Sequence, residues 1–489
     1  MTDSNRLRLT GVRQNTFGVT PNTPRMRTMR VTGEGLSYKP VFETPGDIRP
    51  DRMNADPIKV GETSNGPINY ELHYPVPSSI LAENIASAFQ ADWVDTPTRD
   101  NDGTADSVIT DIGTTANTIA FTTGASYVVG HLVRTSGFAT AGNNSLFPVT
   151  TGGATSLVSS GASFTAEAAP PAAARVKVVG FQGTSGDITA AAGGLASTTL
   201  NFTTLGLSPG QWIKIGGTGA AFRYATEALN TLVRVTGVAA NLLSLDNLPS
   251  GWTTDAGTGK TIRVFFGDRI KNGTASIALT FERGFMGQGT PGYVVNETMQ
   301  VNQWQQQVQS RQKVTGSFDY VGLTGSVSTT SLDSVPDDAP SIAAYPIMAA
   351  GANVGRIAEN GVALTSPNWV KSASFTVNNN LRTKEAADSV ASVDIGSGEA
   401  AMTVSLETYF GSTTLYAKML AGTATNASYR VIKGNQAMVF AWPRLTITDG
   451  SPNASGKNQD VMLPLTLQAS YDSLTGAQMT LDRFEYYEA

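Results

Sequence analysis

The sequence predicts a mainly β protein in which two related modules, each a β-sheet with one short packed helix, flank two inserted small all-β domains. Only 15% of the 489 residues are charged and 50 are glycine, a balance that favours strands and turns over long helices. One strand-to-helix pattern occurs twice, and a weaker pattern occurs twice in the region between the copies. A chain of this length exceeds one ordinary core, so we expect two to four domains.

The stronger repeat aligns residues 68–85 on residues 402–419 without a gap. Few letters are identical, but the apolar positions coincide. In both copies the apolar period changes from two to about four, which predicts a strand that runs into a helix. The coinciding positions are Ile68 with Met402, Tyr70 with Val404, Leu72 with Leu406, Val76 with Phe410, Leu81 with Leu415, and Ile85 with Met419.

Both predicted helices carry end signals. Ser78 or Ser79 is expected to cap the first helix, Ser412 or Thr413 the second, and Gly422 to end the second. Helices of about 12 residues are marginal alone in water, so each is expected to pack on its sheet.

The first copy is preceded by polar sequence and then by a long loop. Residues 1–30 carry two prolines and several arginines and predict an extended arm. A strand is expected around 28–38, followed by a proline-rich loop of mixed charge over 39–62. Loops this long inside a compact domain are uncommon and often functional. The second copy has an equivalent strand at 373–380 and a shorter loop at 381–398.

Beyond the helices the two copies differ in length. Residues 278–284 resemble residues 444–450, so the first copy contains an inserted region near 103–268. Inside this insertion, residues 118–123 reappear as 199–204 and residues 132–134 as 212–214. The period of about 80 residues suits one small sandwich or barrel per half. The expected domains are 1–102 with 269–335 (first module, arm 1–30), 103–186 and 187–268 (inserted domains), and 336–489 (second module).

Composition argues against several classes of protein. The net charge of −5 offers no basic patch for gripping nucleic acid. The absence of cysteine excludes disulfides and thiolate metal sites. The polar N-terminus lacks the apolar core of a signal peptide, and no apolar run is long enough to span a bilayer. We therefore expect a soluble protein without a membrane-spanning segment.

Catalytic patterns are also lacking. His73 and His131 are the two histidines, and each lies in a presumed strand as a solvent-facing residue. No Gly-x-Ser-x-Gly sequence precedes a helix to supply a serine nucleophile. Residues 287–292 match G-x-G-x-x-G, but Pro291 and the apolar run that follows favour a turn before a strand over a dinucleotide site. We expect no enzymatic activity and no cofactor.

The segment from Asp100 to Asp111 resembles a calcium loop only partly. Asp100, Asp102 and Asp106 are spaced suitably, but Ala105 replaces the required glycine and Asp111 the bidentate glutamate. A polar linker without a bound metal is favoured, and an opportunistic cation near Asp100 to Asp106 remains the alternative.

Several segments together resemble the tail tube (major tail) proteins of long-tailed, non-contractile bacteriophages, the siphophages. The resemblance covers about 1–100 and 268–489 and leaves the insertion outside. The matching segments are 15–24 with the strand to Tyr38, 46–52, 66–72, 374–380 and 458–465.

The resemblance implies a structural virion protein. Such subunits form rings whose strands join across subunits into a barrel around a lumen, with a helix outside. The rings stack into the hollow tail tube, and DNA transits the lumen toward the host without specific binding. It also implies assembly in the bacterial host cytoplasm, location in the virion tail, and tape measure, tail terminator and distal tail proteins as partners. The inserted domains would decorate the tube exterior.

Two modules per chain imply a ring of three chains with pseudo-six-fold symmetry, and a ring of six chains is the alternative. The arm and the two loops are the expected ring-to-ring contacts, where alternating charges can fix register. A surface adhesin or glycan-binding β-domain protein is the alternative function, and a glycan hydrolase ranks third. The candidate inter-ring residues are Phe17, Arg25, Arg27, Arg30, Asp47, Ile48, Arg49, Asp51, Arg52, Met53, Lys384 and Glu385.

Overall fold

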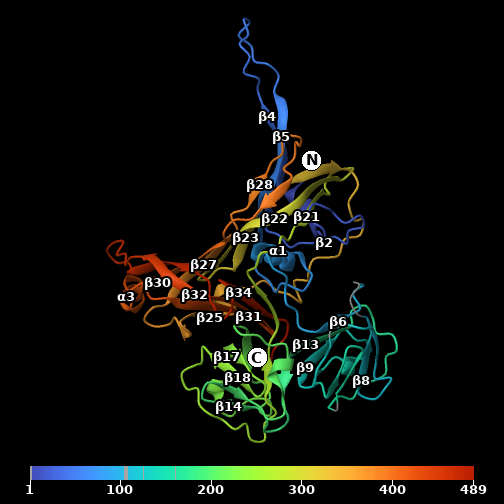
Figure 1. The fold of residues 1–489 in the computed structure, drawn as a ribbon, viewed down its shortest axis with the longest axis vertical. Coiled ribbons are helices and arrows are strands. Elements are labelled where there is room, and N and C mark those ends of the chain that lie inside the picture. Colours follow the sequence, from blue (N-terminus) through green and yellow to red (C-terminus); the bar gives the residue numbers. More distant parts are fainter. Residues whose placement is uncertain (1–2, 104–107, 125, 160, 489) are drawn as a thin grey trace.

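Strands dominate the computed structural model, which describes residues 3–103, 108–124, 126–159 and 161–488. Strands make up 44% and helices 7% of the chain, which confirms the mainly β class, and none of the described sheets closes into a barrel. The molecule is elongated, with a β-hairpin projecting at one end and the inserted strands at the other (Figure 1).

The first module is an antiparallel sheet that combines the start of the chain with the region after the insertion. Each strand hydrogen-bonds to the next in a fixed order. In that order they are β1 (Leu7–Arg13), β21 (Leu279–Phe285), β22 (Gly292–Gln309), β23 (Thr315–Gly322), β5 (Ile58–Glu71) and β4 (Ser37–Glu43). Further short strands are β2 (Arg27–Thr28), β3 (Gly33–Glu34) and β24 (Thr324–Ser328).

The second module repeats these pairings with its own strands, except that the last of them takes the place of β3, not of β4, beside the strand that precedes the helix. In the same order they are β25 (Val354–Glu359), β31 (Thr425–Lys433), β32 (Gln436–Gly450), β33 (Met462–Ala469), β30 (Ala401–Tyr409) and β27 (Val370–Asn378). Its smaller elements are α2 (Ala350–Asn353), β26 (Val362–Ala363), β28 (Arg382–Lys384), β29 (Asp394–Gly396) and β34 (Thr480–Phe484). The two modules are therefore copies of one topology.

The predicted change from strand to helix is confirmed in both copies. Helix α1 (Ile80–Phe89) follows β5, and α3 (Thr414–Leu420) follows β30 at the aligned position. Ser79 caps α1 by accepting a hydrogen bond from the Ala82 amide. The cap expected in the second copy is absent, because the side chain at the N-cap of α3 accepts no such bond. Instead, Asn368 accepts hydrogen bonds from the two backbone amides of residues 411 and 412.

One expected correspondence is wrong. Residues 278–284 lie mostly in β21, and β21 occupies the place that β31 holds in the second module, since β1 pairs β21 as β25 pairs β31. Residues 444–450 belong instead to β32, the counterpart of β22. Period-two alternation looks alike in neighbouring strands, so a seven-residue match could not distinguish them.

Two expectations for the start of the chain are also corrected. Residues 7–13 are no arm, because β1 pairs along its whole length with β21 and Leu9 is 2% exposed. Residues 39–62 form a hairpin with a long tip rather than a loop alone: β4 pairs with β5 from Ser37 to Glu43, and residues 44–57 form the tip. Pro40 fits inside β4 because β4 is an edge strand.

The modules share one core and a continuous ladder. The second half of β22 pairs with β27, from Gln303 opposite Asn378 to Gln309 opposite Ser372. Trp304 is fully buried at this junction and packs edge-on against Phe375 of the second module, with ring centroids 4.8 Å apart. Strand β20 (Asp268–Lys271), which leaves the insertion, pairs with β34 of the second module.

The insertion folds into a ten-stranded and a four-stranded sheet. Strand β13 (Arg175–Gln182) lies between β9 (His131–Ser136) and β19 (Arg263–Phe265), and β19 continues to β16 (Trp212–Ile215). The repeated segments 132–134 and 212–214 both lie in strands of this sheet: the first in β9, which pairs with β13, and the second in β16, which pairs with β19. The other strands are β6 (Thr98–Asp100), β7 (Ile109–Ile112), β8 (Thr118–Phe121), β10 (Leu146–Pro148), β11 (Thr151–Gly152), β12 (Ser156–Val158), β14 (Thr189–Ala191), β15 (Gly194–Ala196), β17 (Leu232–Val238) and β18 (Leu242–Asp246).

The match of 118–123 with 199–204 does not reflect a shared element. Thr118–Phe121 is strand β8, whereas Phe202–Thr204 is a 3-10 helix. The Asn201 side chain accepts a hydrogen bond from the Thr203 amide and so starts that helix.

Candidate assembly surfaces

A continuous antiparallel sheet crosses both modules and has one covered and one open face. Its eight described strands run in the order β3, β5, β23, β22, β27, β30, β33 and β32. Side chains alternate along the second half of β22, from residue 304 to 309: Trp304 and Gln306 are buried in the core, whereas Gln305 and Gln307 are exposed. The same alternation of buried apolar and open polar residues holds along β30 and β33.

Amides and hydroxyls dominate the open face. Two of its carboxylates are paired with lysines, Glu71 with Lys313 and Glu407 with Lys371 at 3.2 Å. The face is therefore strongly hydrated but weakly charged. Its uncharged polar residues include Asn69, Gln305, Gln307, Thr315, Ser317, Ser374, Thr376, Thr403, Ser405, Thr446, Thr448, Thr466 and Gln468.

A buried hydrogen-bond chain ties the modules together beneath this face. The Trp304 indole N–H donates to the Tyr70 hydroxyl at 2.7 Å, and Tyr70 donates to Gln306 Oε1 at 3.2 Å. Gln306 Nε2 donates in turn to the Tyr429 hydroxyl of the second module at 2.5 Å. Burial raises the pKa of both tyrosines, so they remain neutral hydrogen-bond partners.

The hairpin of β4 and β5 forms a first arm that projects well beyond the sheet (Figure 1). Its tip holds the central candidate residues of the sequence analysis, namely Asp47, Ile48, Arg49, Asp51, Arg52 and Met53. Ile48 is fully exposed and Met53 is 67% exposed. Arg49 and Asp51 form an exposed ion pair at 2.6 Å, and the hydrogen bond from Arg49 lowers the pKa of Asp51. The tip therefore presents two exposed apolar side chains and one ion pair to solvent.

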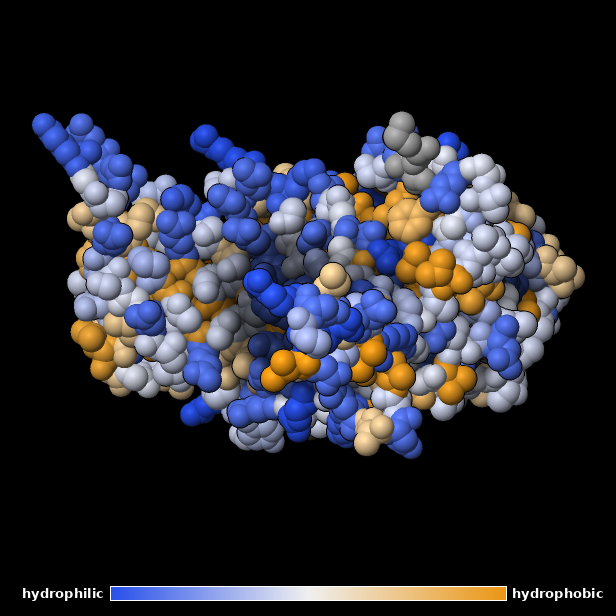
Figure 2. Space-filling model, turned by 90° about the horizontal axis from the view of Figure 1, so that it is seen from above, coloured by the Kyte–Doolittle hydropathy of each residue, from blue (hydrophilic) through white to orange (hydrophobic). Residues whose placement is uncertain are grey.

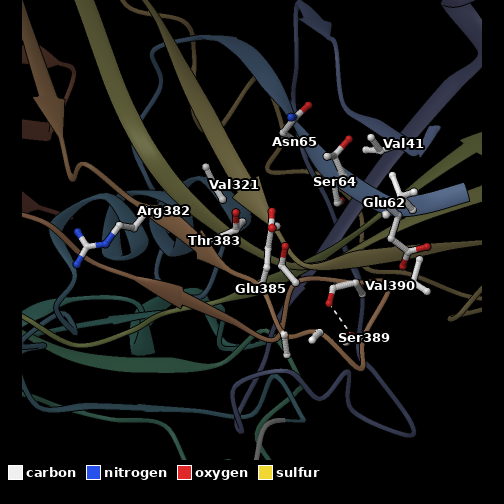
Figure 3. A pocket seen from close by; sticks show the side chains of 18 of the residues that line it. Val41, Glu62, Ser64, Asn65, Val321, Arg382, Thr383, Glu385, Ser389 and Val390 are labelled. Carbon is white, nitrogen blue, oxygen red and sulfur yellow. Dashed lines mark hydrogen bonds between the residues drawn. The ribbon is translucent and has the colours of Figure 1, made fainter. Parts of the chain in front are cut away.

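A shorter second arm, β28 and β29, carries the candidates Lys384 and Glu385. Lys384 forms an ion pair with Asp394 across the hairpin at 2.5 Å. Glu385 lines a groove of about 710 Å³ between the bases of the two arms (Figure 3). Val41 and Val390 face each other across part of this groove, which gives it an apolar patch. Seen from the end with the arms, the surface is mainly hydrophilic, with isolated hydrophobic residues (Figure 2).

The four candidates from residues 1–30 lie away from the arm tips. Arg25 and Arg27 both approach Asp337, at 2.8 and 3.6 Å. Arg30 donates to the Tyr345 carbonyl at 2.7 Å. Phe17 is half-buried in a turn closed by a bridge between residues 16 and 19. These arginines therefore bind the segment of their own chain that connects the two modules.

The two histidines were expected to face solvent, and that expectation is wrong. His73 and His131 are each 2% exposed. Strand β5 ends at Glu71, so the alternation of the strand no longer applies at His73. Burial lowers the pKa of each to about 4, which keeps both neutral near pH 7.

The remaining motifs take structural places. Residues 287–292 join β21 to β22 as a turn, as predicted. Asn101 supports the linker after β6 by accepting a hydrogen bond from the Ile109 amide, whereas Asp106 lies outside the described residues. The part of the chain that the structure describes contains no group of three residues suited to hold a metal ion.

Sequence comparison agrees with this geometry. A model of the phage tail tube protein family matches residues 217–469, just over half of the chain. The chain belongs to the phage tail tube protein family. The match runs from the second half of the insertion through β21 to β24 and nearly all of the second module. No match was found among curated proteins.

Family membership gives the chain a structural role in the phage tail, where it assembles with itself and other tail proteins. Membership in a structural family also favours a non-enzymatic protein. Among the described residues, every helix is too short or too polar to cross a membrane.

Proposed function

We propose that the chain polymerises as stacked rings into the hollow tail tube of a phage with a long non-contractile tail, and that DNA is delivered through the bore. The observation that carries this proposal is the continuous sheet of both modules, which has a core on one face, open polar side chains on the other, and an incompletely paired edge at each end. Sheets with exposed edges gain stability when neighbouring subunits cover them.

The polar face is the proposed lining of the bore. Exposed lysine and arginine side chains would neutralise phosphates and retain DNA, and unpaired carboxylates would repel it. On this surface amides and hydroxyls predominate, Glu71 and Glu407 are paired to lysines, and Asp319 and Arg444 add one charge of each sign, so neither effect dominates. DNA would therefore transit without specific binding, as the resemblance implied.

A ring of three chains is the stoichiometry that the duplication favours. Each module supplies four strands of the continuous sheet, so three chains present six equivalent modules around one bore. A ring of six chains would double that number and requires a far wider bore. The mass of isolated rings distinguishes the two, and a mass of six chains would overturn the trimer.

Stacking of rings is assigned to the arms. The tip residues Ile48 and Met53 expose apolar side chains at one end of the sheet. Trp369, which precedes β27 at the opposite end of the strands, is 56% exposed. If the arm tips of one ring contact the opposite end of the sheet in the next ring, the apolar side chains of the tip and Trp369 would both be covered. Lys384 and Glu385 of the second arm alternate with the first arm around the ring in this arrangement.

The inserted domains are proposed to decorate the outside of the tube. Apolar residues of the insertion, including Trp212 and Phe265, pack on Val439 and Phe484 of the second module, which do not belong to the polar face. The units of assembly are proposed as 1–102 with 269–335, 103–186, 187–268, and 336–489. Removal of 103–268 with a short linker should then leave tubes that are thinner but have the same bore.

Electron microscopy of the purified chain tests the proposal directly. Rings or hollow tubes of uniform bore are expected, together with protection of the polar face from labelling in the assembled form. A protein that stays monomeric under conditions of high concentration and low charge repulsion would overturn the proposal and favour the adhesin alternative.

A further inference from the structure

The junction between the two modules provides a template for contact between chains. Strand β22 pairs with β27 over residues 303–309 and 372–378. Within it, Gln305 lies opposite Thr376. The Asn379 amide donates to the Asn302 carbonyl and the Ser310 amide to the Lys371 carbonyl, which fixes the alternation of bonded and non-bonded pairs. The pair of Gln305 and Thr376 is therefore a non-hydrogen-bonded pair, in which Cα atoms approach to about 4.5 Å.

The second module has the same strand half without a partner. Residues 444–447 of β32 correspond to residues 303–306 of β22, because each stretch pairs on one side with the same strand of its module, β33 or β23, and a bulge between Ile447 and Asp449 shifts the register beyond it. Leu445 and Ile447 point into the core as Trp304 and Gln306 do. Within the described part of the chain, no strand pairs with the other side of residues 446–450.

The first module has the complementary edge. Residues 32–35 flank β5 as β27 flanks β30: Gly33 pairs with Asn69, and the Thr32 and Gly35 amides donate to carbonyls of β5. Strand β27 pairs on its other side with β22, whereas the described strands leave the other side of β3 unpaired. The sheet of each chain thus ends on one side in β32, the counterpart of β22, and on the other side in β3, the counterpart of β27.

We propose that β32 of one copy pairs antiparallel with residues 32–35 of the next copy, with Thr446 opposite Gly33. This inference rests on the proposed ring and names its lateral interface. Transfer of the register of β22 and β27 onto these strands places Thr446 where Gln305 lies and Gly33 where Thr376 lies.

The orientation of side chains agrees with this register. Gly33 lies opposite Asn69, which is on the polar face, and Thr446 is on the same face of β32. A Cβ atom built on Gly33 would meet only the Asn69 side chain, at 3.8 Å, so the polar face has room for a larger side chain at this position. Contact between two different edges is heterologous, and it closes into a ring when the rotation per chain is a whole fraction of a turn.

Cysteine cross-linking tests the register, because the chain has no cysteine of its own. The test variant is Gly33→Cys with Thr446→Cys. Opposite residues of a non-hydrogen-bonded pair have the Cα separation that a disulfide requires. Tubes are assembled under reducing conditions, inspected by electron microscopy, and then oxidised.

Two control variants share the same chemistry. Gln305→Cys with Thr376→Cys occupies the junction inside one chain and should close within the monomer, assembled or not. Gly33→Cys with Arg444→Cys shifts the second position by two residues, where the diagonal separation of about 7–8 Å is too long for a disulfide.

Each outcome decides the inference. Chains linked between subunits in tubes, monomers without linkage before assembly, and no product from the shifted pair would support it. A linked product of three chains also supports the trimeric ring, whereas longer ladders would keep the lateral contact and overturn the trimer. Well-formed tubes that do not cross-link at Gly33 and Thr446, or that cross-link equally at the shifted pair, would overturn the inference and leave the tube intact. Failure of the unmodified chain to form rings would overturn the tube and the lateral contact together.

Discussion

Asp482 provides a sharp test of the energetics of this fold. The residue lies in β34, between β20 and β32, and its side chain is fully buried. Burial raises the pKa of its carboxyl to about 7, against the opposing charge of Arg269, 3.9 Å away. We expect Asp482→Asn to stabilise the protein above neutral pH.

The sign follows from the direction of the pKa shift. Below pH 4 the carboxyl is protonated in both states, so the substitution changes little. Between pH 4 and 7 the unfolded chain releases its proton while the folded chain retains it, so the folded state loses stability as pH rises. A shift of about three pH units corresponds to roughly 4 kcal/mol at pH 8, because each unit is 1.36 kcal/mol. Asparagine has almost the same shape and avoids this loss.

Thermal unfolding of both proteins at pH 4 and pH 8 measures the effect. The variant should unfold several degrees higher at pH 8 and at the same temperature at pH 4. Asp388→Asn, a change at an exposed aspartate of the second arm, controls for the loss of one negative charge. Equal stability of variant and parent at pH 8, or a gain of the same size at both pH values, would refute the conclusion that the ionised, buried carboxylate of Asp482 destabilises the folded protein.

Three further substitutions test separate parts of the structure. Trp304→Ala should cost about 3–5 kcal/mol in denaturant unfolding, since it empties the junction of the modules, whereas Trp369→Ala at an exposed site should cost under about 0.5 kcal/mol. Asp268→Ala should cost about 3–5 kcal/mol, because it removes the buried carboxylate that is bound by Lys177 at 2.8 Å and by Arg483 at 3.0 Å; an effect below about 1 kcal/mol would contradict this. Ile48→Asp at the arm tip should leave unfolding unchanged but shorten or abolish tubes in electron micrographs, and normal tubes would argue against stacking through the tip.

The features of the fold that were predicted correctly from the sequence depend on short, local patterns. The change of period after residues 68 and 402 is confined to a few turns of chain, and both helices start where the alignment placed them, at Ile80 and Thr414. The exposed tip of the first arm was likewise recognised, because Ile48 and Met53 lie among prolines and charges that form no core.

Burial that depends on strands far apart in the sequence was not predicted correctly. Strand β1 looked like an arm because its partner β21 lies beyond the insertion, so nothing nearby in the sequence reveals that Leu9 is buried. His73 looked exposed because alternation was extended two residues past the end of β5. The polar face was not predicted, since the residues that belong to it depend on which strands become neighbours.

The two junctions differ in a way that fits their different roles. Gln306 is buried at the junction within the chain and relies on Tyr70 of one module and Tyr429 of the other for its hydrogen bonds. Both tyrosines are always present, because they belong to the same chain, so this buried amide is never without partners. The corresponding residue at the open edge is Ile447, which is 3% exposed and needs no hydrogen-bond partner. A buried polar side chain there would cost about 1–3 kcal/mol in every free subunit that had not yet found its neighbour. An apolar residue lets the edge stay folded before assembly, and backbone hydrogen bonds of the ladder are then gained only when the next chain arrives.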